Sequence, residues 1–230
     1  MLALPFALIS PHPTDNHDSD EQNPQQVEKL KHMKKYKFDG LVELDQPIAR
    51  RVLIDLVSKT SYWADKKVFK HLRDKNKFGV WYEHVARGRP KGTVRKKTLL
   101  DDNTYANYAI KRALAGDHRM FRPRSFRVCH IYDGKTKDHR YYTCIANLVL
   151  LPSAIHSLTD HYKPVMDVLK YRAYEYYRWR PAGAAVPAKP VYYPSKKVWM
   201  SRILPMTHAV LSQLKQIRAP KKVRRFCMRR

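Results

Sequence analysis

The sequence predicts an α+β protein that is mostly helical, with a small β-hairpin packed on a helix. Two observations favour this fold class. Apolar residues recur at three- and four-residue steps in several stretches, which is typical of amphipathic helices. Residues 125–131 and 141–151 are short apolar runs on either side of the turn signal Asp133-Gly134, so they predict paired strands. With 230 residues, of which 43% are hydrophobic, the chain can bury a sizeable core.

The first half of the chain is predicted to be helical after a polar tail at residues 1–26, which hold four acids and neither Lys nor Arg. Asp45 can cap the first helix, and Pro47 suits its first turn. Gly116 suits the end of a later helix, because glycine readily ends a helix in a left-handed conformation. The predicted elements are helices at 45–57, 62–72 and 101–114, a strand at 78–85 and a basic linker at 87–97.

The second half begins with the predicted hairpin and continues as helices joined by linkers. A helix is predicted at residues 153–160, after Pro152, and another from Pro164 to about residue 179. The remaining predicted segments are a Pro/Ala linker at 181–194, a helical region at 198–217 interrupted at Pro205, and a basic C-terminal tail.

The charge of the chain indicates its partner. There are 46 Lys and Arg against 20 Asp and Glu, a formal net charge of +26. Such an excess favours binding to a polyanion, with nucleic acid expected first and an anionic membrane surface second. No stretch reaches the roughly 18 apolar residues of a membrane span, so we expect no membrane insertion, and residues 1–9 lack the positive start of a signal peptide. Three cysteines cannot form a disulfide framework, which favours a reducing, cytoplasmic location, nucleoid-associated if the chain is bacterial.

One block combines residues that can carry chemistry. His130 ends the first predicted strand of the hairpin, and Asn147 follows 17 residues later. The predicted helix after the second strand carries His156, Asp160 and His161. Because His156 and Asp160 are four residues apart, they would share one helical face.

The block, residues 127–161, resembles the HNH, or ββα-metal, endonuclease motif. The resemblance implies a ββα-metal core at residues 116–180 that hydrolyses phosphodiester bonds in DNA, with His130 as the general base and Asn147 holding it in place. It also implies a divalent metal, Mg²⁺ or Mn²⁺, with Zn²⁺ and Ni²⁺ as alternatives. The metal ligands implied are Asp160, His156, His161 and Cys129.

This chemistry is coherent, although one position departs from the family pattern. A histidine near its ordinary pKa of about 6.5 can take a proton from water, and a cation can neutralise the charge that develops on the phosphate. The family has an acid or a histidine where this chain has Cys129, so Asp133 or Asp138 would have to substitute, or the metal would be softer, or the site would be inactive. His139 is a rival base, but it lies only eight residues before Asn147, which leaves little room for a loop and a strand.

A zinc site built from Cys129, His130 and Cys144 is a further interpretation. It lacks the CxxC spacing that structural zinc sites use. We expect these cysteines to be small buried residues on adjacent strands instead.

A basic segment at residues 87–97 predicts contact with DNA. Arg87-Gly88-Arg89-Pro90 resembles the core of an AT-hook, which lies in the narrow minor groove of A·T-rich DNA. The alternative is a solvated linker that touches phosphates without sequence preference. The residues expected to contact nucleic acid are Arg87, Arg89, Lys91, Arg95, Lys96, Lys97, Arg127 and Arg140.

The same charge also supports a second function class, a non-catalytic protein that binds DNA, RNA or the ribosome. We expect double-stranded DNA as the partner. The nucleic-acid-binding regions would be residues 27–115 and the helix and basic tail at 195–230. Arginine and aromatic residues also alternate at residues 171–180, but their spacing favours a core stripe over a base-stacking surface.

Overall fold

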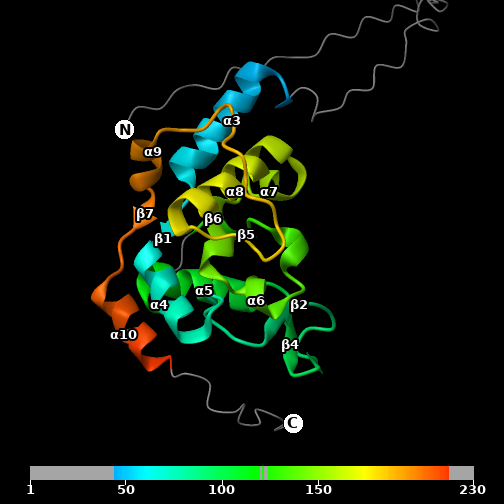
Figure 1. Cartoon of the computed structure of the whole chain (residues 1–230), viewed down its shortest axis with the longest axis vertical. Coiled ribbons are helices and arrows are strands. Elements are labelled where there is room, and N and C mark those ends of the chain that lie inside the picture. Colours follow the sequence, from blue (N-terminus) through cyan, green and yellow to red (C-terminus); the bar gives the residue numbers. More distant parts are fainter. Residues whose placement is uncertain (1–43, 120, 122–123, 218–230) are drawn as a thin grey trace, which may run out of the picture. The chain divides into compact units, whose positions relative to one another are not determined.

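The predicted hairpin lies at the centre of the structure, a computed structural model that describes residues 44–119, 121 and 124–217. Its strands are β5 (Phe126–His130) and β6 (Leu148–Pro152), which pair antiparallel with His130 opposite Leu148. The helices are α3 (Pro47–Thr60), α4 (Lys66–Asn76), α5 (Thr104–Ala115), α6 (His139–Tyr142), α7 (Leu158–His161), α8 (Lys163–Tyr177), α9 (Lys196–Met200) and α10 (His208–Gln216). In Figure 1 the hairpin lies between α7 and α8 on one side and α5 and α6 on the other. The predicted α+β class, mostly helical with a small hairpin packed on helices, is confirmed.

The structure has two further small sheets, one between distant parts of the chain and one that is local. β1 (Trp63–Ala64) pairs parallel with β7 (Ile203–Leu204). β4 (Thr98–Asp101) lies between β2 (Val85–Arg87) and β3 (Val94–Arg95), parallel to β2 and antiparallel to β3. The predicted linker at 87–97 is only partly correct, because Arg87 ends β2 and Val94–Arg95 form β3, whereas residues 88–93 and 96–97 lie in no strand.

The second strand of the hairpin is shorter than predicted. Residues 141–147 fold as the end of α6 and the 3-10 turn η2 (Ile145–Asn147), and only the residues from Leu148 onward form β6. The Asp138 carboxylate caps α6 by accepting a hydrogen bond from the Arg140 backbone N–H at 2.9 Å. A short apolar run can be a buried helix as well as a strand, so periodicity alone could not separate the two.

Other boundaries also differ from the predictions. The predicted strand at 78–85 is wrong, because Val80 forms only an isolated bridge and β2 begins at Val85. The predicted helix at 62–72 begins later, at Lys66, where the Asp65 side chain caps it. The first helix starts at Pro47 after Gln46, without a side-chain cap from Asp45. The predicted helix at 153–160 is reduced to α7, and β7 interrupts the helical region at 198–217.

One hydrophobic core joins these elements. Its members run from Ile54 on α3 to Leu214 on α10 and include both strands of the hairpin. Gly116 ends α5 as predicted, with φ +85°, and a Cβ atom there would lie 2.7 Å from the Ala209 backbone carbon at α10. Within the described part of the chain, no helix is both long and apolar enough to cross a membrane. The predicted tails at residues 1–26 and 218–230 lie outside the described residues.

Candidate functional site

One pocket, which we call the hairpin pocket, brings together residues that the sequence singled out. It has a volume of about 310 Å³ and lies where the His130 end of β5 meets α7 and β2. Of the predicted site residues, it contains the proposed base, three of the four proposed metal ligands and two of the arginines. Its lining residues are Arg87, Asn103, Arg127, Val128, Cys129, His130, Asp133, His156, Thr159 and Asp160.

His130 is held in one orientation at the wall of this pocket. Its ring is 4% exposed and stacks on the Tyr142 ring, with centroids 5.3 Å apart and an angle of 18° between the planes. Nε2 lies 2.9 Å from the Tyr142 backbone carbonyl. Because a carbonyl oxygen can only accept, Nε2 carries the proton and Nδ1 is the nitrogen with a free lone pair. Burial lowers the pKa of His130 to about 4, so the ring is neutral at pH 7.

Tyr142, which no sequence pattern indicated, fixes the orientation of the His130 ring. Its hydroxyl donates to Asp101 Oδ2 at 2.7 Å and accepts from the Asn103 backbone N–H at 2.6 Å. The same Asp101 oxygen accepts from the Tyr105 backbone N–H in the first turn of α5. The carbonyl and the ring that hold His130 are therefore tied to the start of α5. No local pattern could reveal this contact, since 41 residues separate Tyr142 from Asp101.

Asn147 is fully buried and links the two ends of the loop between the hairpin strands. Its Oδ1 accepts from the Tyr132 backbone N–H at 2.8 Å, and its Nδ2 donates to the Tyr141 carbonyl at 3.1 Å. Its own carbonyl accepts from the Ile131 N–H at 2.9 Å. Asn147 does not line the pocket, but it bonds to the residues next to His130 and next to Tyr142. Asn147 therefore ties the segment after His130 to the segment that carries Tyr142.

An ion pair between Arg87 and Asp133 forms another part of the pocket wall. Both side chains remain partly exposed. The Arg87 charge lowers the pKa of His130, whereas the Asp133 charge raises it, and both effects are smaller than that of burial. An anion entering the pocket would therefore meet an arginine beside the neutral imidazole.

The donors in the pocket suit a partly hydrated divalent cation. His156 Nδ1 lies 2.7 Å from the Ser153 carbonyl, so it donates and leaves Nε2 free to accept. Asp160 is exposed, and Asn103 Oδ1, at the pocket wall, is buried without a hydrogen-bond partner among the residues that the structure describes. No cluster of three or more His, Cys, Asp or Glu side chains in the described residues has the arrangement of a metal cage. Mg²⁺ needs only one or two protein ligands because it keeps several waters.

Two of the predicted ligands fit less well. Burial raises the pKa of the Cys129 thiol to about 12, so it stays protonated at neutral pH, and a metal-binding cysteine must be a thiolate. His161 is exposed and is not part of the pocket lining. Asp160 and His156 are therefore the pair best placed to hold a cation. The zinc interpretation meets the same obstacle, because burial also raises the pKa of Cys144 to about 12.

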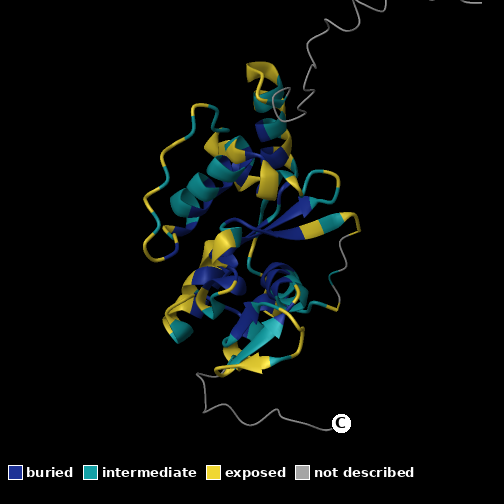
Figure 2. Cartoon of the chain, turned by 90° about the vertical axis from the view of Figure 1, so that its right-hand side faces the viewer, coloured by how far each residue is buried: buried dark blue, intermediate teal, exposed yellow. Residues whose placement is uncertain are grey.

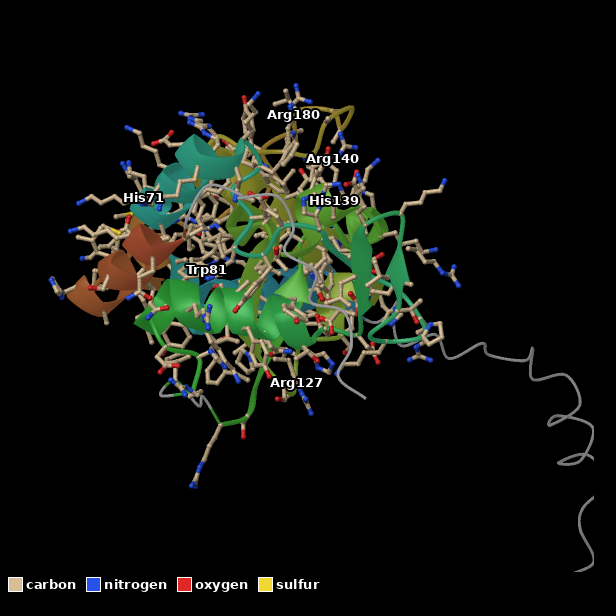
Figure 3. All side chains as sticks on the ribbon, turned by 90° about the horizontal axis from the view of Figure 1, so that it is seen from below. His71, Trp81, Arg127, His139, Arg140 and Arg180 are labelled. Carbon is tan, nitrogen blue, oxygen red and sulfur yellow. The ribbon has the colours of Figure 1, made fainter. Side chains whose placement is uncertain are left out.

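The residues predicted to contact nucleic acid divide into separate groups. Those of the second sheet surround its exposed edge, which lies at the bottom of Figure 2. Arg127 lies at the exposed end of β5, whereas Arg140 on α6 pairs with Asp138. Figure 3 shows Arg127 and Arg140 on opposite sides of the view, so they do not form one patch. The exposed group near the second sheet is Arg89, Lys91, Arg95, Lys96 and Lys97.

No protein-family model, curated protein sequence or solved structure matches the chain. What supports a functional interpretation is therefore the pocket itself. It combines a neutral imidazole of fixed orientation, the Asp160 carboxylate on α7, the His156 imidazole in the turn before α7, and two arginines.

The burial of His130 predicts a specific dependence of stability on pH. The unfolded chain binds this proton with a pKa of about 6.5, whereas the folded chain binds it with a pKa of about 4. Between these values the unfolded state holds more protons, so the free energy of unfolding falls as the pH falls from about 6.5 to 4 and is constant above. The difference corresponds to about 3 kcal/mol in full. Urea unfolding between pH 7 and pH 4 should show a larger loss for the wild type than for His130→Gln, and equal losses would contradict the assignment.

Proposed function

We propose that the chain is a metal-dependent endonuclease of the HNH type that hydrolyses phosphodiester bonds in DNA. One observation carries most of the support. His130, His156 and Asp160, which their spacing and the HNH resemblance singled out, line one pocket although they belong to different segments. Arg87 and Arg127 line the same pocket, in a chain whose net charge is +26.

In this mechanism Nδ1 of His130 removes the proton from an attacking water. A bond forms between the water oxygen and phosphorus while one phosphorus–oxygen ester bond breaks, which leaves a phosphate monoester and a hydroxyl. The bound phosphodiester would raise the low pKa of His130, because a nearby negative charge favours the imidazolium. Arg87 and Arg127 offset the charge of the phosphate. When bound by Asp160 and His156, Mg²⁺ or Mn²⁺ would stabilise the charge that develops on the phosphate and the leaving oxygen.

Plasmid nicking by the purified full chain tests this function. We expect supercoiled DNA to become nicked with Mg²⁺ or Mn²⁺, and to stay intact when a chelator is present. The variant Asp160→Asn should need more metal for the same rate, since it loses a charged oxygen ligand. If no metal supports nicking at any protein concentration, the catalytic function is lost and only nucleic-acid binding remains.

The exposed edge of the second sheet should contribute to DNA affinity. Replacing Arg95, Lys96 and Lys97 together by Gln is expected to reduce the slope of log K against log salt by up to about 3, because each phosphate contact contributes about 0.9. Fluorescence anisotropy with a 20-base-pair duplex between 50 and 300 mM salt measures this slope. The matched control is Lys59, Lys137 and Lys215 replaced by Gln, which removes the same charge from other exposed positions. Equal slopes for the two triple variants would show that this edge makes no specific contribution.

A non-catalytic nucleic-acid-binding protein is the second candidate, and the burial of His130 favours it, since a general base must reach water. Binding without cutting, unaffected by a chelator, would support this function. Under either function we propose a cytoplasmic location, nucleoid-associated in a bacterium. Cys129 and Cys144 are free thiols, which is consistent with a reducing compartment.

A further inference from the structure

A second hollow in the molecule has the properties of an anion site. It has a volume of about 580 Å³ and lies where the start of α4, the end of α8, the start of α9 and β7 meet. We call it the α8 pocket. Its walls hold five cationic and two acidic side chains. The cationic residues are Lys66, Lys67, Arg172, Arg178 and Lys196.

Arg172 is the buried member of this group. Its side chain is 2% exposed, and Nη1 donates to the Glu175 carboxylate at 3.2 Å. Nε and Nη2 are buried and have no acceptor among the described residues. Burying a cation without full pairing is costly, so these N–H groups favour an additional acceptor.

Aromatic rings hold the Arg172 guanidinium in place without satisfying these donors. Its central carbon lies 4.7 Å from the centroid of the Tyr176 ring and 5.3 Å from that of Trp199. The Trp199 indole N–H is itself buried without an acceptor in the described structure. Glu175 also accepts a hydrogen bond from the Tyr193 hydroxyl at 2.6 Å, so its charge is shared. The guanidinium is therefore fixed in orientation and incompletely neutralised.

The other cations at the pocket form no salt bridge within the described part of the chain, while its other acid, Asp65, already accepts two backbone hydrogen bonds. The Asp65 carboxylate accepts from the Lys67 backbone N–H at 2.8 Å as the cap of α4, and from the Met206 N–H at 3.3 Å. For the four other basic residues, no carboxylate in the described part of the chain lies within 4.0 Å of a side-chain nitrogen. Cations thus exceed acids by three at this pocket, an excess that attracts an anion of more than one charge or a segment of polyanion.

We propose that the α8 pocket binds a phosphate group, supplied by the backbone of the bound DNA. A phosphate oxygen accepts several charged N–H donors at once, and arginine suits it through its fork of donors. The hollow lies on different elements from the hairpin pocket, so it would hold the nucleic acid away from the site of cleavage. Only the source of the phosphate rests on the proposed function. Free inorganic phosphate offers the same chemistry and is the other source to be distinguished.

Two binding measurements on the full chain, both with a chelator so that no cutting occurs, test this site. The first is the rise in the melting temperature of the protein on adding inorganic phosphate, compared with the rise on adding chloride at the same ionic strength. The second is the salt dependence of affinity for a 20-base-pair duplex. The pocket variant is Lys66→Gln with Lys196→Gln, at exposed positions whose replacement leaves the core intact. The matched control is Lys70→Gln with Lys215→Gln, which removes the same charge outside the pocket. Arg172→Gln is added as the variant with the largest expected loss.

The pocket variant is expected to reduce the duplex salt slope by about 0.9 relative to the wild type, the contribution of one phosphate contact, while the control reduces it by less than half as much. Loss of the phosphate-induced shift with an unchanged duplex slope would support the site and identify free phosphate as its ligand. If the pocket variant equals the control in both measurements, the site is refuted, even when Arg172→Gln fails to fold. Neither binding measurement involves cleavage. A negative result therefore does not bear on the proposed nuclease activity, and the binding results can be interpreted even if the chain does not cut DNA.

Discussion

His130→Ala is expected to reduce plasmid nicking by about 10²–10⁴-fold, the usual contribution of a positioned general base. The physical reason is that Nδ1 of His130 is the one ring nitrogen left free to take a proton, since Nε2 donates to the Tyr142 carbonyl. Initial rates of nicking at pH 8 with saturating Mn²⁺ measure the effect. His130→Gln should lose as much activity, although its amide can still donate to that carbonyl.

The control for this prediction is His139→Ala, which removes the rival base. The His139 ring contacts the His84 ring at a tilt of 32°, with centroids 5.4 Å apart, and does not line the hairpin pocket. We expect its rate to stay within about threefold of the wild type, since a residue outside the site contributes little to the barrier. Equal rates for His130→Ala and the wild type, with both folded by circular dichroism, would exclude His130 as the base.

Asn147→Ala is expected to lower the free energy of unfolding by about 1–3 kcal/mol, because it leaves the part-buried Tyr132 N–H without its acceptor. The Tyr141 carbonyl, which the Asn147 amide joins to Tyr132 across the loop, keeps the Cys144 N–H as a donor at 3.4 Å. Urea unfolding at pH 7 measures the change. The variant should also lose nicking activity, because the loop that it destabilises orients His130.

Asn107→Ala is a suitable control for the loss of an amide. Its Nδ2 donates to the Asn103 carbonyl within the first turns of α5, at a partly exposed position. Alanine is also the better helix former, so we expect a change within about 0.5 kcal/mol. If Asn147→Ala changes stability as little as Asn107→Ala does, the loop is held by other contacts and the positioning role fails.

Local sequence patterns predicted the first strand of the hairpin and the start of α8, because one strong signal marks each of them. The run at 125–131 contains β5, and Pro164 lies in the first turn of α8. The sheet of β2, β3 and β4 was missed, because strands of two to four residues are too short for an alternating pattern to appear. Its parallel pairing of β2 with β4 also depends on contacts that no local rule contains.

The site was predicted in part for the same reason. Spacing over the hairpin and the segment after it, together with the HNH resemblance, named His130, His156 and Asp160, which line the pocket together. The same pattern also named Asn147 and His161, which do not line it. The partners supplied by distant elements could not be found this way. Arg87 was named for its charge and not as the partner of Asp133, from which it is 46 residues away. Cys129 was named as a ligand by its place beside His130, and its burial agrees with the other interpretation of the cysteines, as small buried residues.

The pairing of β1 with β7 has a consequence for how the protein is made. Trp63, which is fully buried, has its strand partner at Ile203, so 140 residues must be added before this part of the core can close. At 5–20 residues per second, a ribosome needs roughly 7–28 s for that stretch. During this time the nascent chain exposes an indole ring together with a large positive charge. We therefore expect the nascent chain to bind chaperones, or to contact ribosomal RNA, before it reaches its native state.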